Sequence, residues 1–251
     1  MDVSCSTSCI PHRDPHTVEP VLHTIDTDYF ELFVFNHWDT QKASRIFAGY
    51  PFFSVHGSKR LCFILEEDIN QGIALLKQDI TLAHKVGAST LVIHAYNSLN
   101  TNPDLSQVVA ALKKTQKYAA DRSITLSIEL IPHKTISIPD LAAFFDKIDW
   151  INFTFDLEYT SKFQCLIPVL TYVSKVNNVH VRDYDGTWII NGKRRYLKPG
   201  DGTSDFDTIF STIAASGYTS MYTLEAPHNS VKEINQSMKW LTTSLKTHTH
   251  L

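Results

Sequence analysis

The chain has 251 residues, of which 43% are hydrophobic and 20% are charged, and its formal net charge is −3 at pH 7. This composition is that of a globular protein and excludes a disordered or fibrous one. The acidic balance argues against nucleic acid as the main partner, because duplex binding needs a basic surface. No apolar stretch reaches the roughly 18 to 20 residues that span a bilayer, and the start of the chain lacks signal-peptide features. We expect a cytoplasmic protein that binds neither nucleic acid nor membrane.

Short runs rich in β-branched and aromatic residues alternate with longer amphipathic stretches, which is typical of repeated strand–helix units around a parallel sheet. The predicted strands are, in chain order, residues 2–6, 30–35, 52–56, 90–95, 124–130, 151–156, 178–183 and 220–225. Eight strands close a barrel of this type, which commonly has about 250 residues. Since no linker, internal repeat or low-complexity tract divides the chain, the sequence predicts an α/β fold, a (β/α)8 TIM barrel, as a single domain over residues 1–251.

The stretch 103–122 is a predicted helix, with Asn102 as its cap and Pro103 at its first position. Three glycines follow amphipathic runs and precede predicted strands, as a left-handed helix C-terminus favours: Gly49, Gly87 and Gly217. Cys5, Cys9, Cys62 and Cys165 are too few for a disulfide framework and lack a paired CxxC zinc spacing. We expect Cys5 and Cys9 to be reduced and structural.

Four late strands end in residues that can bind a metal, namely Glu129, Asp156, His180 and Glu225. In a parallel barrel the carboxyl ends of the strands share one face, where active sites lie. Singly, Glu129 or Glu225 could cap a helix or pair with a lysine, and Asp156 could cap the helix that follows it. His180 alone could be a hydrogen-bonded core histidine. Three converging carboxylates repel one another unless a cation neutralises them. Their place on successive strands therefore favours one shared divalent metal ion, and Mn²⁺, Co²⁺, Mg²⁺ and Zn²⁺ all suit oxygen and nitrogen ligands.

At these residues the chain resembles the xylose-isomerase-like TIM barrel superfamily. That superfamily includes sugar and sugar-phosphate isomerases and epimerases and the endonuclease IV type of DNA-repair enzyme. The similarity covers nearly the whole chain, and its order and spacing are more specific than any single motif. The segments that carry it are LSIELIPH (126–133), FTFDLEY (153–159), HVRD (180–183), PGDG (199–202) and YTLEAPH (222–228).

In the epimerase branch of this family, the residues matching Glu129, Asp156, His180 and Glu225 bind one divalent metal, and the two glutamates also move the proton. The resemblance therefore implies that Glu129 and Glu225 are the catalytic acid/base pair. Five further residues are expected to bind substrate, with packing at the barrel mouth as the alternative: His56, His94, Arg182, Trp38 and Tyr159. Two other loop residues, His37 and Trp188, are open to either interpretation. Glu31 matches a family position of unclear role.

One departure from the family concerns the sixth strand. Relatives often have Asp-x-x-His there, whereas this chain has Asp156 followed three residues later by Tyr159. The DNA-repair branch needs that histidine, and it also needs an Asp-x-His motif in a loop where this chain has KRRYLKPGDG. Tyrosine is no ready metal ligand at neutral pH. A three-metal phosphodiesterase site is therefore disfavoured, and a mononuclear site is expected.

A divalent ion bound by neighbouring hydroxyl and carbonyl oxygens acidifies the adjacent C–H bond. We therefore expect a metal-dependent sugar or sugar-phosphate isomerase or epimerase that transfers a proton through an enediolate. The sequence does not separate these reactions from a dehydration. The alternatives are an endonuclease IV-like metal-dependent phosphodiesterase and a non-catalytic sugar-binding barrel. Whether the chain forms a homo-oligomer is left open.

The segment 187–202 contains Asn191-Gly192, which predicts a small β-hairpin with a type I′ turn after the seventh strand. The segment is rich in basic residues, which are interpreted either as a solvated tip or as contacts to a substrate phosphate: Lys193, Arg194, Arg195 and Lys198.

Overall fold

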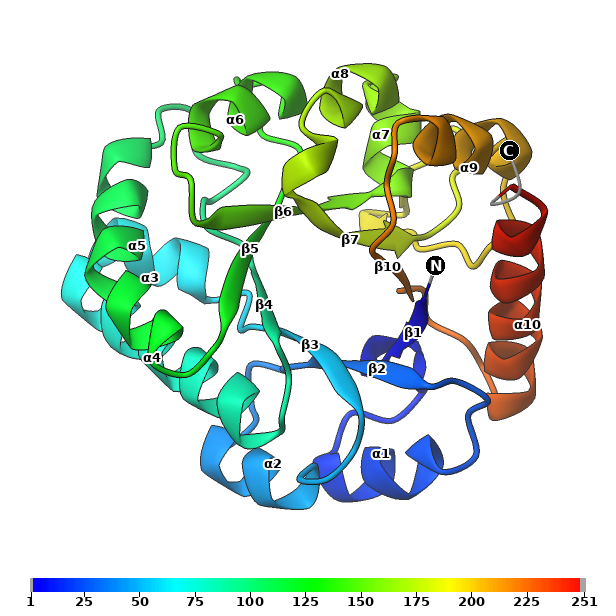
Figure 1. Cartoon of the computed structure of the whole chain (residues 1–251), viewed down its shortest axis with the longest axis horizontal. Coiled ribbons are helices and arrows are strands. Elements are labelled where there is room, and N and C mark those ends of the chain that lie inside the picture. Colours follow the sequence, from blue (N-terminus) through cyan, green and yellow to red (C-terminus); the bar gives the residue numbers. More distant parts are fainter. Residues whose placement is uncertain (1, 249–251) are drawn as a thin grey trace.

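A computed structural model describes residues 2–248 and contains a closed barrel of parallel strands (Figure 1). Around the barrel the strand order is β1, β10, β7, β6, β5, β4, β3, β2, so the last strand of the chain closes on the first. The predicted TIM barrel is therefore confirmed. Residue 1 and residues 249–251 of the predicted domain lie outside the described part. The barrel strands are β1 (Val3–Ser6), β2 (Tyr29–Phe33), β3 (Phe52–His56), β4 (Thr90–Ile93), β5 (Thr125–Glu129), β6 (Ile151–Asp156), β7 (Val176–Val181) and β10 (Met221–Leu224).

Helices form an outer ring around these strands (Figure 1). Their apolar residues recur at helical spacing on the face that packs against the barrel, as Ile73, Leu76, Ile80 and Ala83 do in α4. No helix in residues 2–248 is long and apolar enough to cross a membrane. The helices are α1 (Pro15–Leu22), α2 (Thr40–Ile46), α3 (Leu61–Glu67), α4 (Ile69–Lys85), α5 (Leu105–Ala120), α6 (Ile138–Phe145), α7 (Leu157–Phe163), α8 (Leu166–Leu170), α9 (Phe206–Ala215) and α10 (Val231–His248), with short 3₁₀ turns η1 (Thr7–Cys9) and η2 (Val173–Lys175).

The start of α5 differs from the prediction. The carboxylate of Asp104 accepts hydrogen bonds from the backbone N–H groups of Ser106 and Gln107, so Asp104 caps the helix. The prediction that Asn102 is the cap and Pro103 the first helical residue is wrong. A carboxylate immediately before the first buried residue of the helix satisfies its free N–H groups better than an amide two residues earlier.

Several positions inside the barrel are polar. Ser4 Oγ lies 2.6 Å from Thr223 Oγ1, and Ser127 Oγ lies 2.8 Å from Thr154 Oγ1. Thr223 in turn donates to the side-chain oxygen of Asn178 at 2.7 Å. All five residues are fully buried, so these bonds satisfy groups that would otherwise be costly to desolvate. They form a hydrogen-bonded layer within the barrel.

The segment between β7 and α9 has two parts. The first is the predicted hairpin, in which β8 (Ile189–Ile190) pairs with antiparallel β9 (Lys193–Arg194). Asn191 and Gly192 have φ values of 52° and 72°, the positive values that a type I′ turn requires. The second is the PGDG motif, which wraps around the buried carboxylate of Asp183. This carboxylate accepts hydrogen bonds from four backbone N–H groups, those of Tyr184, Gly200, Gly202 and Ser204.

The four cysteines are buried and free, as expected for structural thiols. Burial raises the pKa of Cys62 and that of Cys165 to about 11, so neither is a reactive thiolate at neutral pH.

Candidate metal centre and active site

Four side chains converge at the carboxyl ends of adjacent strands. Glu129 and Asp156 are the last residues of β5 and β6, His180 lies in β7, and Glu225 directly follows β10. Asp156 and His180 are partners in the β6–β7 register, and His180 is level with Thr223 on β10. Each of the four offers one ligand atom, and these atoms all lie within 4.8 Å of one another. The residues form a buried Glu/Asp/His cluster of the kind that holds a divalent metal.

Two atoms of this cluster lack hydrogen-bond partners. His180 Nδ1 and Glu225 Oε2 are buried and 3.1 Å apart, yet neither makes a hydrogen bond within residues 2–248. Buried polar atoms are normally satisfied, so unpartnered ones need an explanation. A nitrogen and a carboxylate oxygen that face each other at ion-pair distance without a hydrogen bond fit the donor set of a divalent cation. On this test the four residues suit a metal ion.

His180 forms a hydrogen bond with Glu31, whose role the sequence did not reveal. Glu31 is fully buried inside the barrel, and its Oε2 accepts a hydrogen bond from His180 Nε2 at 3.2 Å. The same oxygen accepts bonds from Ser54 Oγ at 2.8 Å and from Asn178 Nδ2 at 3.2 Å. Because Nε2 carries the proton in this bond, Nδ1 is the ring nitrogen turned toward Glu225 and Glu129. A carboxylate behind a ligating histidine is a frequent way of fixing its tautomer.

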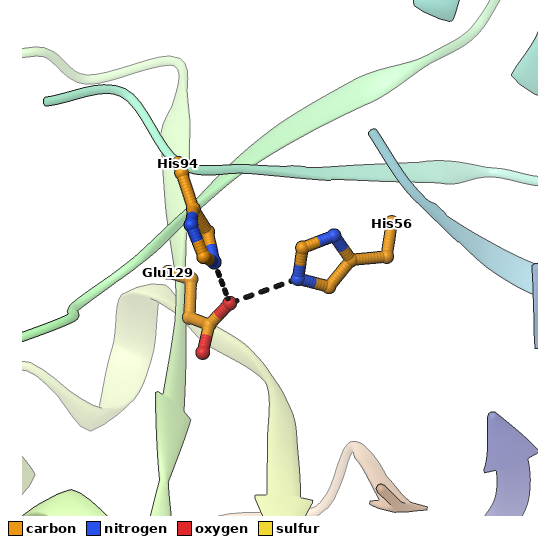
Figure 2. A group of neighbouring side chains, drawn as sticks. All are labelled: His56, His94 and Glu129. Carbon is orange, nitrogen blue, oxygen red and sulfur yellow. Dashed lines mark hydrogen bonds and ion pairs between the residues drawn. The ribbon is translucent and has the colours of Figure 1, made fainter. Parts of the chain in front are cut away.

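A second group lies on the other side of Glu129 (Figure 2). Glu129 Oε2 lies 2.7 Å from His94 Nε2 and 2.9 Å from His56 Nε2. Glu129 Oε1 faces His180 and Arg182. His56 Nδ1 is 3.1 Å from the carbonyl oxygen of Gly57, which orients the ring. The two histidines and Glu129 could also hold a metal. The structure thus brings both predicted histidines to the site, where they contact Glu129.

Electrostatics keep Glu129 and Glu225 ionised. Burial disfavours the carboxylate form of Glu129, but the neighbouring His94, His180 and His56 outweigh it and hold its pKa well below the usual value. Burial acts on Glu225 in the same way, but Arg182 and His180 outweigh it and lower its pKa. For His94, burial dominates and lowers the pKa to about 4. At neutral pH the two glutamates can bind a cation or accept a proton.

Arg182 lies among the carboxylates. Its Nη2 contacts Asp156 Oδ2 and lies 3.6 Å from Glu225 Oε2 and 4.0 Å from Glu129 Oε1. Its Nε is 3.6 Å from Glu158 Oε2. This guanidinium is buried and already balanced by several negative charges. It therefore orients and neutralises the acidic groups of the site.

A small pocket of about 170 Å³ leads to this cluster. Glu225 and Arg182 form part of its wall, together with the aromatic rings of Phe33, Phe35 and Tyr196. Pockets for drug-sized ligands have volumes of roughly 300–1,000 Å³. A molecule no larger than a single small sugar suits this space.

Comparison with known proteins identifies the fold family. The sequence model of the family described as "Xylose isomerase-like TIM barrel" matches residues 10–244. The chain belongs to this family. No curated protein matches it in sequence.

Several solved structures resemble this chain over nearly its full length. A D-tagatose 3-epimerase-like protein is 13% identical, with a TM-score of 0.76, 100% of this chain and 99% of the other covered. A D-allulose 3-epimerase from Methylomonas sp., in complex with D-allulose, is 15% identical, with a TM-score of 0.76 and 97% of each chain covered. The IOLI protein with a bound zinc atom is 14% identical, with a TM-score of 0.77 and 99% of each chain covered. At these identities the likeness shows a shared fold.

Tyr159 stands where the family resemblance predicts a histidine. Its ring packs edge-on against Trp188, with the centroids 6.1 Å apart, and it lies 5.4 Å from the Arg182 guanidinium. Burial raises the pKa of Tyr159, so its hydroxyl stays protonated at neutral pH. Tyr159 therefore borders the acidic site as a neutral aromatic group.

Trp38 is placed differently from the other predicted substrate contacts. It stacks on Phe47 and donates its indole N–H to the carbonyl oxygen of Arg13 at 2.7 Å, and His37 Nε2 lies 3.2 Å from the same oxygen. It lines a larger outer cavity of about 700 Å³ and is not among the residues that line the small pocket. Both side chains fix the segment between η1 and α1, and direct contact of Trp38 with substrate stays a prediction.

The basic hairpin residues are mostly paired. Arg194 makes two bonds of 2.6 Å to the carboxylate of Glu158. Arg195 pairs with Asp185, and Lys198 Nζ lies 3.2 Å from Glu233 Oε2. The Arg194 and Lys198 pairs join the loop to α7 and α10, and the Arg195 pair lies within the loop. Three of the four basic residues considered for contact with a substrate phosphate are therefore already ion-paired.

Proposed function

We propose that this chain is a metal-dependent isomerase or epimerase of a small sugar or sugar derivative. The observation that supports this most is the convergence of Glu129, Asp156, His180 and Glu225, with ligand atoms within 4.8 Å of one another, at the carboxyl face of the barrel. The structural neighbours named as sugar epimerases favour the same chemistry. One divalent ion would be held by these four residues.

Such an ion, when bound, polarises a substrate carbonyl and acidifies the neighbouring C–H bond. The protein residues then do the proton transfer. Glu129 and Glu225 are ionised, both face His180 Nδ1 (at 3.8 and 3.1 Å) and can act as the acid/base pair, one removing a proton and the other returning it. Proton return to the same carbon from the opposite face gives epimerisation, and return to the adjacent carbon gives isomerisation. His56 and His94 orient the carboxylate of Glu129 for this step.

The test uses solvent deuterium incorporation. Metal-loaded protein is incubated with a panel of ketoses and their phosphates in D₂O, and exchange is followed by NMR. We expect about one bound divalent ion per chain by elemental analysis, exchange with at least one panel member, and loss of that exchange in Glu129→Gln with an unchanged circular dichroism spectrum. Exchange at the wild-type rate in Glu129→Gln would exclude the proposed proton transfer.

The hydrolase alternative has one supporting feature, the His56–His94–Glu129 group, which could bind a further metal. Abasic-site DNA is the substrate that distinguishes it. Nicking by the wild-type protein above the level of a Glu225→Gln control would favour a phosphodiesterase. The small pocket and the acidic net charge favour the sugar enzyme.

A further inference from the structure

Two cationic side chains stand at the rim of the small pocket that leads to Glu225 and Arg182. Arg13 comes from the segment between η1 and α1, and Lys59 from the segment between β3 and α3. The first segment follows β1, which lies two strands from β7 around the barrel, and the second follows β3, which lies opposite β7 (Figure 1). Neither residue stood out in the sequence, because an isolated basic residue in a loop has no pattern.

Both cations lie over aromatic faces and lack an acidic partner. The guanidinium carbon of Arg13 is 4.7 Å from the ring centre of Phe35, and Lys59 Nζ is 5.1 Å from that of Phe33. The side chain of Arg13 makes one polar contact, a 3.4 Å bond to the carbonyl oxygen of Ser8. Within residues 2–248, no carboxylate lies within ion-pair distance of either side chain. Cation–π contacts of this kind hold a charge in place without neutralising it.

The other cations near the site are already balanced. Arg182 faces the carboxylates of the proposed metal ligands, and Arg194 forms a two-bond ion pair with Glu158. The positive charges of this pocket that lack an acidic partner are therefore those of Arg13 and Lys59, and an anionic group that enters the pocket would be attracted to them. The Trp38 bond to the carbonyl oxygen of Arg13 fixes the backbone from which this side chain extends.

We propose that Arg13 and Lys59 form a subsite for an anionic group, a carboxylate or a phosphate, carried by a small sugar derivative. The anionic end lies between the two cations, and the carbonyl or hydroxyl end reaches Glu225 and the rest of the cluster. The subsite deepens the proposed function and rests on it for the identity of the reacting end. It predicts that neutral sugars bind weakly and that anionic ones are the natural substrates.

The test measures binding rather than turnover, by calorimetry with metal-loaded protein. The probes are D-fructose, D-fructose 6-phosphate, D-glucuronate and inorganic phosphate. We expect at least one of the three anionic probes to bind about tenfold or more tightly than D-fructose, with an affinity that falls as salt is added. The two sugar anions and inorganic phosphate distinguish a carboxylate subsite, a phosphate subsite and one that needs the sugar as well.

The variants are the double substitution Arg13→Gln with Lys59→Gln and, as a matched control, Arg195→Gln with Lys198→Gln. Loss of two charge-assisted contacts should weaken the anionic probes about ten- to a hundredfold, while D-fructose binding and the control variant stay unchanged. Equal affinities for neutral and anionic probes, no binding of any anionic probe at millimolar concentration, or an unaffected double variant would overturn the proposal.

The two proposals fail separately. Charge-dependent binding through Arg13 and Lys59 without deuterium exchange would leave the anion subsite standing and remove the isomerase proposal. Deuterium exchange with a neutral ketose at a rate that the double substitution does not change would support the isomerase proposal and remove the anion subsite.

Discussion

The buried carboxylate of Glu31 provides a direct test of how this barrel supports its candidate metal centre. The substitution Glu31→Gln keeps the shape of the side chain and removes its charge. Of the three donors to Glu31 Oε2, only His180 belongs to the proposed ligand set, and its bond is 3.2 Å long. Ser54 and Asn178 are the other two donors and lie within the barrel.

The expected magnitude follows from this arrangement. Loss of a charged partner behind a ligating histidine typically weakens metal affinity about 10- to 100-fold, which corresponds to about 1.4–2.7 kcal/mol. The amide of the new glutamine also places an N–H₂ group where Glu31 Oε1 now has no hydrogen-bond partner. Both effects loosen the orientation of His180, so the affinity should fall rather than rise.

The assay is competition for Mn²⁺ or Zn²⁺ with a chromophoric chelator, and circular dichroism confirms the fold of each variant. Ser54→Ala is the matched control, because it removes a different donor to the same oxygen and leaves the His180 bond in place. Ser54→Ala should lower the affinity for the metal less than Glu31→Gln does. A folded Glu31→Gln protein that binds metal as tightly as the wild type would refute the argument that Glu31 orients His180.

Two further predictions concern stability. Asp79 is fully buried, and burial raises its pKa from 3.8 to about 7, so the folded protein binds this proton more tightly than the unfolded chain and loses stability as the pH rises through that window. Because the pKa rises from 3.8 to about 7, this loss of stability amounts to at most about 4 kcal/mol. Asp79→Asn should remove the loss, which urea unfolding of both proteins at pH 5 and pH 8 measures. The same difference in unfolding free energy between the two proteins at both pH values would contradict the prediction. In Gly202→Ala, the new Cβ would lie 2.4 Å from Asp183 Oδ1 and must push this carboxylate from its backbone donors. We expect the free energy of unfolding to fall by about 1–3 kcal/mol, as measured by thermal unfolding. An unchanged melting temperature would show that the PGDG loop accommodates the new methyl group without loss of stability.

The strand–helix alternation determined the architecture because each βα unit must bury the apolar face of its helix against a parallel sheet. Several strand boundaries differ from the predicted ones. The prediction placed the seventh strand at 178–183, whereas β7 is Val176–Val181, so Arg182 and Asp183 lie just beyond it. Hydrogen bonding to neighbouring strands, which is non-local, sets where a strand ends.

The sequence by itself determined the eight-stranded barrel and pointed to Glu129, Asp156, His180 and Glu225, since acidic and histidine side chains at the ends of successive strands form a pattern along the chain. Only the tertiary structure decided which groups meet these residues. It placed Glu31 behind His180 and balanced Arg182 with carboxylates, whereas Arg13 and Lys59 lack acidic partners. The physical reason is that charge compensation depends on distances between segments far apart in the chain, which local sequence patterns do not encode.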